Sequence, residues 1–354
     1  MLFANIIIDI SHEKVDRPFG YIIPKQLEEQ LQVGMSVRVP FGKGNTVRTG
    51  YIIEITAQAS FDPLKMKEIL GIAEDQSDAN GLLIRLAAWM KRRYGSTMIT
   101  ALKTVIPARK KTKTLEKKQL IRLMTSAEVS SLEQICLQKH QVAKARVLHE
   151  LIEEEVLPRE LVTGKLHVSA ATINALIKQG VIREEAYEYL RDPVKTADRT
   201  EQRVLLSTKQ QQIVAAVCKD RTQGIHGTYL IHGITGSGKT EVYMALIEAC
   251  IAEHKAAIVL IPEIALTYQT LMRFYKRFGN RVSVMNSTLS AGEKYDQCER
   301  ARRGEIDVII GPRSALFTPF AHLGLIIIDE EHEASYKSET TPKYHAKDVA
   351  IELA

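Results

Sequence analysis

One stretch of the chain has the residue types and the spacing that bind a polyphosphate. The pattern G-x-x-x-x-G-K-[ST] occurs once, over residues 233–240, as Gly-Ile-Thr-Gly-Ser-Gly-Lys-Thr. Glycines let backbone N–H groups wrap phosphate oxygens, Lys239 reaches the terminal phosphates, and the Thr240 hydroxyl is a ligand for Mg²⁺. A strand-like run precedes the pattern and a helical run follows it, as this chemistry requires. The other residues expected around the phosphates are Gly233, Gly236, Ser237, Gly238 and Glu241.

A second stretch, "LGLIIIDEEHEASY", ends an aliphatic run in three acids and a histidine. Carboxylates at the end of a buried strand are costly unless a cation offsets them. In P-loop NTPases an Asp at such a strand end completes the Mg²⁺ shell. We therefore expect Asp329 to bind Mg²⁺ through a bound ATP and Glu330 to orient the attacking water, against the alternative of a solvated acidic loop. His332 either couples the nucleotide site to a DNA-binding segment or is a polar residue at a strand end.

Alternating strands and helices position both stretches. Residues 193–354 contain the apolar runs of a βαβ rhythm, which predicts a parallel sheet covered on both faces. The expected strands lie over residues 228–233, 256–263, 281–287, 306–311 and 323–329, and the expected helices over 240–254, 265–279 and 292–304.

Residues 1–105 have a different character and are predicted to be mostly β. Short strand-like runs over 3–9, 19–24, 35–41 and 48–55 are separated by Gly, Pro and Asn turns. The tetrapeptide "GKGN" suits a hairpin turn. A helical run over 79–95 follows and ends in Lys91, Arg92, Arg93 and the C-capping Gly95. The single tryptophan, Trp89, is expected to pack in the core.

The middle of the chain contains a linker and a small domain. Residues 106–118 hold six Lys or Arg against one Glu, which indicates either an attraction for phosphate backbones or a solvated linker. Residues 119–192 contain helical runs over 143–155 and 169–180, with Ser169 as N-cap and Gly180 as stop, then a ribbon-like run over 181–193. This is a winged-helix pattern, which serves for DNA binding or for protein contact.

The bulk composition excludes some classes of protein. The 354 residues are 45% apolar and 25% charged, and no run reaches the ~18 apolar residues of a membrane span. The four cysteines are far apart and form no C-x-x-C pair, which argues against a disulfide framework or a zinc site and fits a reducing cytoplasm. The net charge of +6 lies mostly in the linker.

Several segments together resemble one family. "LIHGITGSGKTEVY", "VLIPEIALT", "GPRSALFTPF" and "IIIDEEHEASYK" are similar to the PriA family, the bacterial primosomal protein N′ helicases of superfamily 2. "RPFGYIIP" and "VRVPFGKG" resemble that family's DNA-binding domain, so the likeness covers the whole chain. It implies a 3′-end DNA-binding domain over 1–105, a winged helix over 119–192, and a RecA-like helicase lobe over 193–354.

The resemblance also implies roles for individual residues. Gln210 matches a glutamine that reads adenine, and its amide can pair with two edge atoms of that base. Pro262, Glu263 and Thr267, and then Arg313 and Ser314, match motifs along the single-strand path. The segment "SYKSETTPKYHAKD" matches the family's aromatic-rich loop, with DNA contact and coupling to hydrolysis implied for Tyr336, Lys337, Tyr344 and His345.

In the N-terminal domain the resemblance implies capture of the 3′ end of a nascent strand by Phe19, Tyr21, Gly42 and Lys67. The family commonly has an acid between the two aromatic residues, whereas this chain has Gly20. A glycine cannot accept a hydrogen bond from the terminal nucleotide through a side chain. Asp16 is the nearby carboxylate that is a candidate to replace it.

The whole pattern predicts part of an ATP-dependent 3′→5′ DNA helicase that recognises replication forks and D-loops and starts primosome assembly. ATP and Mg²⁺ are expected, with zinc only in the full-length family, because the chain lacks the family's cysteine-rich insertion. Implied partners are single-stranded DNA-binding protein and primosome proteins. We expect a monomer near the bacterial nucleoid, without a membrane. The chain ends before an S-A-T-P motif and a second RecA-like lobe, so we expect a piece that unwinds nothing. The alternative is a fork-binding, partner-loading module. A generic P-loop transporter or kinase lobe explains neither "GPRSALF" nor the β domain.

Overall fold

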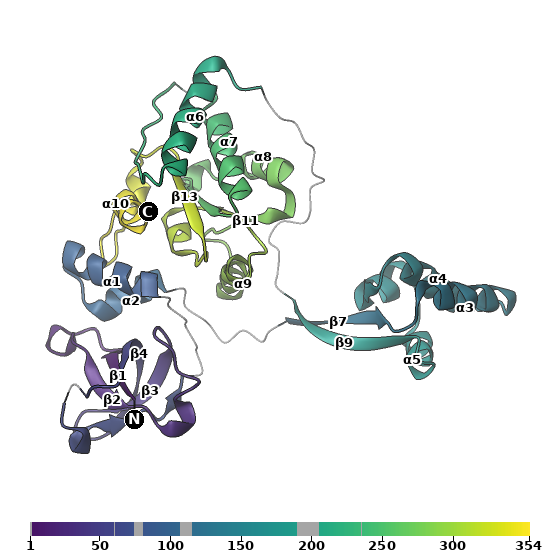
Figure 1. Cartoon of the computed structure of the whole chain (residues 1–354), viewed down its shortest axis with the longest axis horizontal. Helices are drawn as coiled ribbons and strands as arrows, with labels where there is room; N and C mark the ends of the chain where they lie inside the picture. Colours follow the sequence, from purple (N-terminus) through teal and green to yellow (C-terminus); the bar gives the residue numbers. More distant parts are fainter. Residues whose placement is uncertain (1, 60, 74–80, 107–114, 190–204, 235) are drawn as a thin grey trace. The chain divides into compact units, whose positions relative to one another are not determined.

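The structure is a computed structural model that describes residues 2–59, 61–73, 81–106, 115–189, 205–234 and 236–354 (Figure 1). The chain divides into two compact units. One comprises Met1–Thr112 and Arg191–Ala354, and the other comprises Lys113–Leu190. Each unit has hydrophobic core residues of its own.

The first unit begins with a six-stranded sheet of order β5-β2-β1-β4-β3-β6. Its strands are β1 (Phe3–Ile8), β2 (Phe19–Ile22), β3 (Ser36–Phe41), β4 (Thr46–Thr56), β5 (Lys67–Glu68) and β6 (Gly71–Ile72). The predicted hairpin is present, because Phe41 of β3 pairs with Thr46 of β4 across the turn "GKGN". Alternate residues of the strands, such as Ala4, Ile6 and Ile8, bury one face of the sheet. The mostly-β prediction for this region is therefore confirmed.

Two helices follow the sheet. The predicted helix is α1 (Gly81–Tyr94), and Gly95 ends it at φ 63°, a left-handed conformation that glycine adopts without strain. Helix α2 (Met98–Val105) was not predicted. It begins where the side chain of Thr97 accepts a hydrogen bond from the Thr100 N–H. Trp89 is partly buried and packs edge-on against Tyr94, with ring centroids 5.7 Å apart.

The rest of the first unit contains a four-stranded parallel sheet of order β11-β12-β10-β13. Its strands are β10 (Ala256–Leu260), β11 (Val282–Val284), β12 (Val308–Gly311) and β13 (Leu323–Ile328). The accompanying helices are α6 (Thr208–Thr222), α7 (Lys239–Ala252), α8 (Tyr268–Phe278), α9 (Ala291–Arg302) and α10 (Ala346–Leu353).

Both faces of this sheet are covered, as the apolar strands predict. Ala257 and Val259 of β10 belong to a cluster with residues of α7 and α8. Ile258 and Leu260 point the other way, into a cluster with residues of α9 and α10. All five residues of β10 are buried. The parallel sheet is thus confirmed, and it carries the P-loop helix on one face.

One expected strand is not formed. Residues 228–233, predicted to be the strand before the P-loop, contain no strand, and Leu230 is 77% exposed. In the described parts of the chain, β13 pairs only with β10, and no strand runs beside residues 228–233. An apolar run forms a strand only when a neighbour supplies its backbone hydrogen bonds, so the prediction of a strand here is wrong.

In its described residues the second unit combines three α-helices and a π-helical segment (Leu161–Lys165) with an antiparallel sheet of order β8-β7-β9. Its elements are β7 (Leu115–Arg122), α3 (Ser126–Gln138), α4 (Val142–Glu153), β8 (Val156–Pro158), α5 (Ala170–Lys178) and β9 (Ile182–Tyr189). Helix α3 was not predicted. Residues 115–118, expected in a basic linker, begin β7, and the expected ribbon over 181–193 contributes one strand, β9, paired with β7. The remaining linker residues 107–114, and residues 190–204, lie outside the described residues.

None of the helices in the described ranges has the length and apolar character needed to span a membrane.

Candidate nucleotide site and DNA-contact residues

The P-loop leads into the N-terminus of α7. Gly236 and Gly238 have φ values of 80° and 81°, which place their backbones in the left-handed region. Gly238 is the N-cap of α7, so Lys239 and Thr240 begin the helix, whose free N–H groups and dipole favour an anion. The Nζ of Lys239 donates a hydrogen bond to the carbonyl oxygen of Gly233 at 2.7 Å. The ammonium group therefore lies over the loop that would hold the phosphates.

Gln210 lies against the same loop. Its side chain forms a capping box with Ser207 at the start of α6, in which the Ser207 N–H donates to Oε1 at 2.8 Å. The Nε2 of Gln210 lies 3.3 Å from the carbonyl oxygen of Ser237 and 3.4 Å from that of Gly238. A Cβ on Gly238 would come within 2.5 Å of that Nε2. The structure thus brings Gln210 to the P-loop, with both ends of its amide already engaged by protein groups.

Asp329 follows directly after β13 and faces α7. The hydroxyl of Tyr243, one turn along α7 from Thr240, lies 3.3 Å from Oδ1 of Asp329. The N–H of Glu330 donates to the same oxygen at 3.2 Å. Burial and the nearby charge of Glu330 raise the pKa of Asp329, while the hydrogen bonds and the charge of Lys239 act in the opposite direction. Tyr243 and Asp329, which are 86 positions apart in sequence, thereby meet at the carboxyl edge of the sheet.

This arrangement fits Mg²⁺. Carboxylate and hydroxyl oxygens are the ligands that this ion prefers, usually together with phosphate oxygens. Asp329 is a half-buried carboxylate whose hydrogen bonds leave lone pairs free, and Thr240 stands in the first turn of α7. Thr240 and Asp329 would hold the ion. Bound there, it would neutralise charge on the phosphates.

The other acids of the motif have different environments. Glu330 adopts a left-handed conformation, with φ 47°, which is unusual for a residue with a side chain. His332 lies 3.8 Å from the Glu330 carboxylate, and its side chain is 72% exposed. Glu331 forms an ion pair with Lys347 of α10 at 3.0 Å. The predicted phosphate residue Glu241 instead faces α8, with its carboxylate 3.8 Å from Arg277.

The aromatic-rich segment is packed inward. Tyr336 is 1% exposed, and its hydroxyl lies 2.7 Å from the carbonyl oxygen of Asp329 and 3.0 Å from that of Leu260. Tyr344 is 5% exposed and packs edge-on against Phe317. Neither ring offers a face on which a base could stack. The sequence-based expectation of direct DNA contact by these two tyrosines does not fit this conformation, because both rings belong to the core.

The polar residues of that segment lie nearer the surface. Arg313 donates to the carbonyl oxygens of Ser335 and Lys337, and the neighbouring Ser314 is exposed. Lys337 is exposed, with its ammonium group 5.8 Å from the ring centroid of Tyr94. His345 is the N-cap of α10. Of these sequence-predicted DNA contacts, Ser314 and Lys337 are the accessible ones.

The four residues predicted to hold a DNA 3′ end lie together in the N-terminal sheet. Tyr21 of β2 pairs with Lys67 of β5. It is 4% exposed, and its hydroxyl donates to the carbonyl oxygen of Pro40 at 3.1 Å, so it supports the cluster from the core side. The Nζ of Lys67 donates to the carbonyl oxygen of Gly42 at 2.7 Å. Phe19 packs edge-on against Phe41 with ring centroids 5.1 Å apart. Residues from β2, β5 and the β3–β4 turn therefore form one cluster, and Phe19, Tyr21, Gly42 and Lys67 are together called the 3′-end cluster.

Asp16, the candidate substitute for the missing acid, has other partners. Its Oδ1 accepts a hydrogen bond from the Met98 N–H at 2.7 Å, and its Oδ2 lies 2.7 Å from Nζ of Lys91. The side chain is only 11% exposed. This carboxylate joins the loop before β2 to helices α1 and α2, and it is not free to bind a nucleotide.

Sequence reasoning missed two residues of these sites. The guanidinium of Arg17 lies 5.3 Å from the ring centroid of Phe19, in a cation–π arrangement at the 3′-end cluster. Tyr243 contacts Asp329. The signal for Tyr243 was its helical spacing of three residues from Thr240, which places both side chains on one face of α7.

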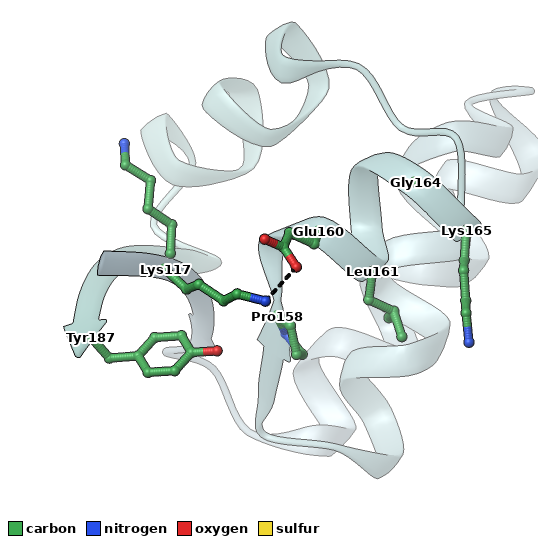
Figure 2. Close-up of a pocket in the computed structure, with 8 residues that line it drawn as sticks. Lys117, Pro158, Glu160, Leu161, Gly164, Lys165 and Tyr187 are labelled. Atoms are coloured by element: carbon green, nitrogen blue, oxygen red, sulfur yellow. Dashed lines mark hydrogen bonds and ion pairs between the residues drawn. The ribbon is translucent and has the colours of Figure 1, made fainter. Parts of the chain in front are cut away.

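A cavity in the second unit is lined by Lys117, Lys118, Pro158, Glu160, Leu161, Gly164, Lys165 and Tyr187 (Figure 2). Two of its lysines have acidic partners: Lys117 lies 2.8 Å from Glu160 and Lys118 lies 2.7 Å from Glu184. Figure 2 shows Lys165 directed away from the Lys117–Glu160 pair. Because these ammonium groups do not converge, the cavity is not built as a phosphate site.

Two family models match the chain. Residues 5–107 match the PriA model described as a 3′ DNA-binding domain. Residues 203–353 match the model described as the type III restriction enzyme, res subunit. The first model covers the six-stranded sheet with α1 and α2, and the second covers the P-loop, α6 and the parallel sheet.

Curated relatives match the chain along its length. The replication restart protein PriA of Bacillus subtilis is 34% identical over 419 residues, which cover 100% of this chain and 52% of the relative. The protein of the same name from Chlamydia trachomatis is 33% identical over 368 residues, covering 99% of this chain and 47% of the relative. That from Haemophilus influenzae is 31% identical, covering 96% and 46%. The chain spans about half the length of these relatives and belongs to the PriA family of replication restart proteins.

Proposed function

We propose that this chain is the fork-recognising and nucleotide-binding part of an ATP-dependent 3′→5′ DNA helicase that starts primosome assembly at stalled or repaired replication forks. The observation that carries the proposal is the meeting of the P-loop helix with Asp329, in the same compact unit as the 3′-end cluster. ATP would be held by the P-loop with Gln210 near its adenine, and Mg²⁺ by Thr240 and Asp329. Glu330 would orient the attacking water.

Branched DNA is the substrate, with Arg313, Ser314, Lys337 and His345 along the single-strand path. The three helices and antiparallel sheet of the second unit fit a winged helix, which contacts either duplex DNA or a protein. The proposed partners are single-stranded DNA-binding protein and primosome proteins. Zinc is proposed only for the full-length protein. The protein is proposed to be a monomer in the bacterial cytoplasm, at the nucleoid.

Lys239→Ala tests this function. In the full-length protein we expect the substitution to abolish DNA-stimulated ATP hydrolysis and unwinding, because the positive charge of Lys239 no longer offsets the negative charge of the phosphates. In the present chain it should leave fork binding within about twofold, since the 3′-end cluster is separate from the P-loop. Full ATPase activity in the full-length variant would contradict the nucleotide site.

A second candidate is a fork-binding module whose helicase lobe is only a platform for partners. The observation that favours it is that Tyr21, Gly42 and Lys67 lie together through contacts that involve no residue of the P-loop. Titrating this chain with ADP and Mg²⁺ separates the two candidates. Saturable binding supports the helicase lobe, and its absence supports the platform.

A further inference from the structure

Tyr243 of α7 lies at the proposed nucleotide site, on which the role inferred for it rests. Tyr243 is buried at 8% exposure, and its hydroxyl lies 3.3 Å from Oδ1 of Asp329. It stands three residues after Thr240 on α7, so both side chains leave the same face of one rigid helix. The helix that begins at the P-loop therefore also holds a hydrogen-bond donor against the carboxylate expected to meet the metal ion.

The hydrogen bonds of Asp329 are distributed unequally. Tyr243 and the Glu330 N–H both donate to Oδ1, whereas no residue that the structure describes donates to Oδ2. The unshared oxygen is the one left for a cation. A hydrogen bond to one carboxylate oxygen fixes the side-chain torsion and thereby the direction of the other oxygen.

The backbone of Asp329 is held as well. Its N–H donates to the carbonyl oxygen of Leu260 at 2.9 Å, and its own carbonyl oxygen lies 2.7 Å from the hydroxyl of Tyr336. With the backbone fixed by β10 and Tyr336, the remaining freedom of Asp329 is rotation of its side chain. Tyr243 is the side chain that restricts this rotation.

We propose that Tyr243 is a positioning residue that orients the Asp329 carboxylate toward the magnesium ion of a bound nucleotide. Because Thr240 and Tyr243 share α7, a movement of the P-loop helix moves one metal ligand together with the donor that orients the other. The donor is not a ligand itself. Its effect therefore belongs to the Mg²⁺-dependent part of nucleotide binding and not to the contacts that the P-loop makes with phosphate.

Equilibrium titration of this chain with a fluorescent ADP analogue, in saturating Mg²⁺ and separately in EDTA, tests the proposal. For Tyr243→Phe we expect affinity in Mg²⁺ to fall about tenfold, the size of one hydrogen bond to a charged group. Affinity in EDTA should change by less than about twofold, and the Mg²⁺ concentration for half-maximal binding should rise. Tyr275→Phe, which removes the hydroxyl of another tyrosine buried in the same core cluster, is the matched control and should bind like the parent chain.

A double-mutant cycle distinguishes positioning from a general loss of packing. In an Asp329→Asn background, Tyr243→Phe should have no further effect on Mg²⁺-dependent binding, because the carboxylate that it orients is gone. Equal losses in both backgrounds, or equal losses in Mg²⁺ and in EDTA, would overturn the positioning role while leaving the nucleotide site intact. Absence of nucleotide binding by the parent chain would overturn the proposed site and this inference with it.

Discussion

The ammonium group of Lys67 lies 2.7 Å from the carbonyl oxygen of Gly42 and joins β5 to the turn between β3 and β4. Lys67 also pairs in register with Tyr21 of β2, so it brings a cation to the 3′-end cluster. We expect Lys67→Ala to weaken binding of a fork with a free 3′ end about fivefold, through loss of a charge near the terminal phosphodiester.

Lys43→Ala is the matched control for Lys67, because Lys43 lies in the same turn and is exposed. It should change affinity less than twofold at the same salt concentration. Fluorescence anisotropy with a labelled fork measures both variants. Equal losses would mean that the turn contributes only general positive charge and that the contact of Lys67 with Gly42 has no special role.

The side-chain amide of Gln210 cannot hydrogen-bond to adenine while it keeps its present protein contacts. Its Oε1 caps α6 and its Nε2 faces the P-loop carbonyls, so reading adenine requires these contacts to be exchanged. We expect Gln210→Ala to lower the affinity for ADP about tenfold relative to GDP, since two base contacts are lost. Gln211→Ala, at the next position of α6, should leave the ratio of the two affinities unchanged. An unchanged ratio in both variants would show that Gln210 serves only the helix cap and the loop.

Asp16 is predicted to be structural. Replacing it by Ala removes two hydrogen bonds to a carboxylate that is 11% exposed, and we expect the free energy of unfolding to fall by about 2 kcal/mol. Urea unfolding followed by the fluorescence of Trp89, which lies on the same helix as Lys91, measures the loss. Lys65→Ala is the control, because its ion pair with Asp62 is long, at 3.8 Å, and its side chain is 72% exposed. Its effect should stay within about 0.5 kcal/mol. Similar losses in the two variants would contradict a structural role for Asp16.

The buried phenol of Tyr344 should make the free energy of unfolding depend on pH in the alkaline range. Burial raises its pKa to about 12, against roughly 10 in an unfolded chain. The folded state therefore holds the phenolic proton more tightly. This contribution to stability is complete below about pH 10 and is lost as the pH rises toward 12, at up to about 1.4 kcal/mol per pH unit. Tyr344→Phe has no proton to lose, so its free energy of unfolding should fall less steeply between pH 9 and 11. Identical slopes in urea titrations would contradict the buried phenol.

The sequence predicted those elements whose local pattern and tertiary surroundings agree. The apolar run of β10 is buried on both faces, and the hairpin turn "GKGN" lies between paired strands. Residues 228–233 also contain an apolar run, yet they form no strand, because the backbone partners that a strand needs are set by distant residues. Helix α3 was missed because only Val129 and Cys136 of its residues are buried, which leaves a weak periodic signal.

For the site, spacing identified the P-loop and Asp329 but not their surroundings. Interleaved aromatic and basic residues indicated a DNA-contacting loop, whereas Tyr336 and Tyr344 turned out to be core residues. A sequence pattern cannot distinguish an aromatic ring that faces solvent from one whose hydroxyl binds a backbone carbonyl. Tyr243 was missed for a related reason, since its partner Asp329 lies 86 positions away. Such pairs are created by the packing of α7 on the sheet.

A chain that combines a DNA 3′-end site with the P-loop and its sheet should distinguish forks by the chemistry of the leading-strand 3′ end. Fork binding is measured by fluorescence anisotropy at one fixed salt concentration, with two forks that differ only at the leading-strand end, a free 3′-OH in one and a 3′-phosphate in the other. A clear preference for the free 3′-OH is the predicted result, because Phe19, Tyr21, Gly42 and Lys67 form one cluster. Equal binding of the two forks would contradict this prediction. It would mean that the cluster, with Gly20 in place of an acid, does not recognise the 3′-OH.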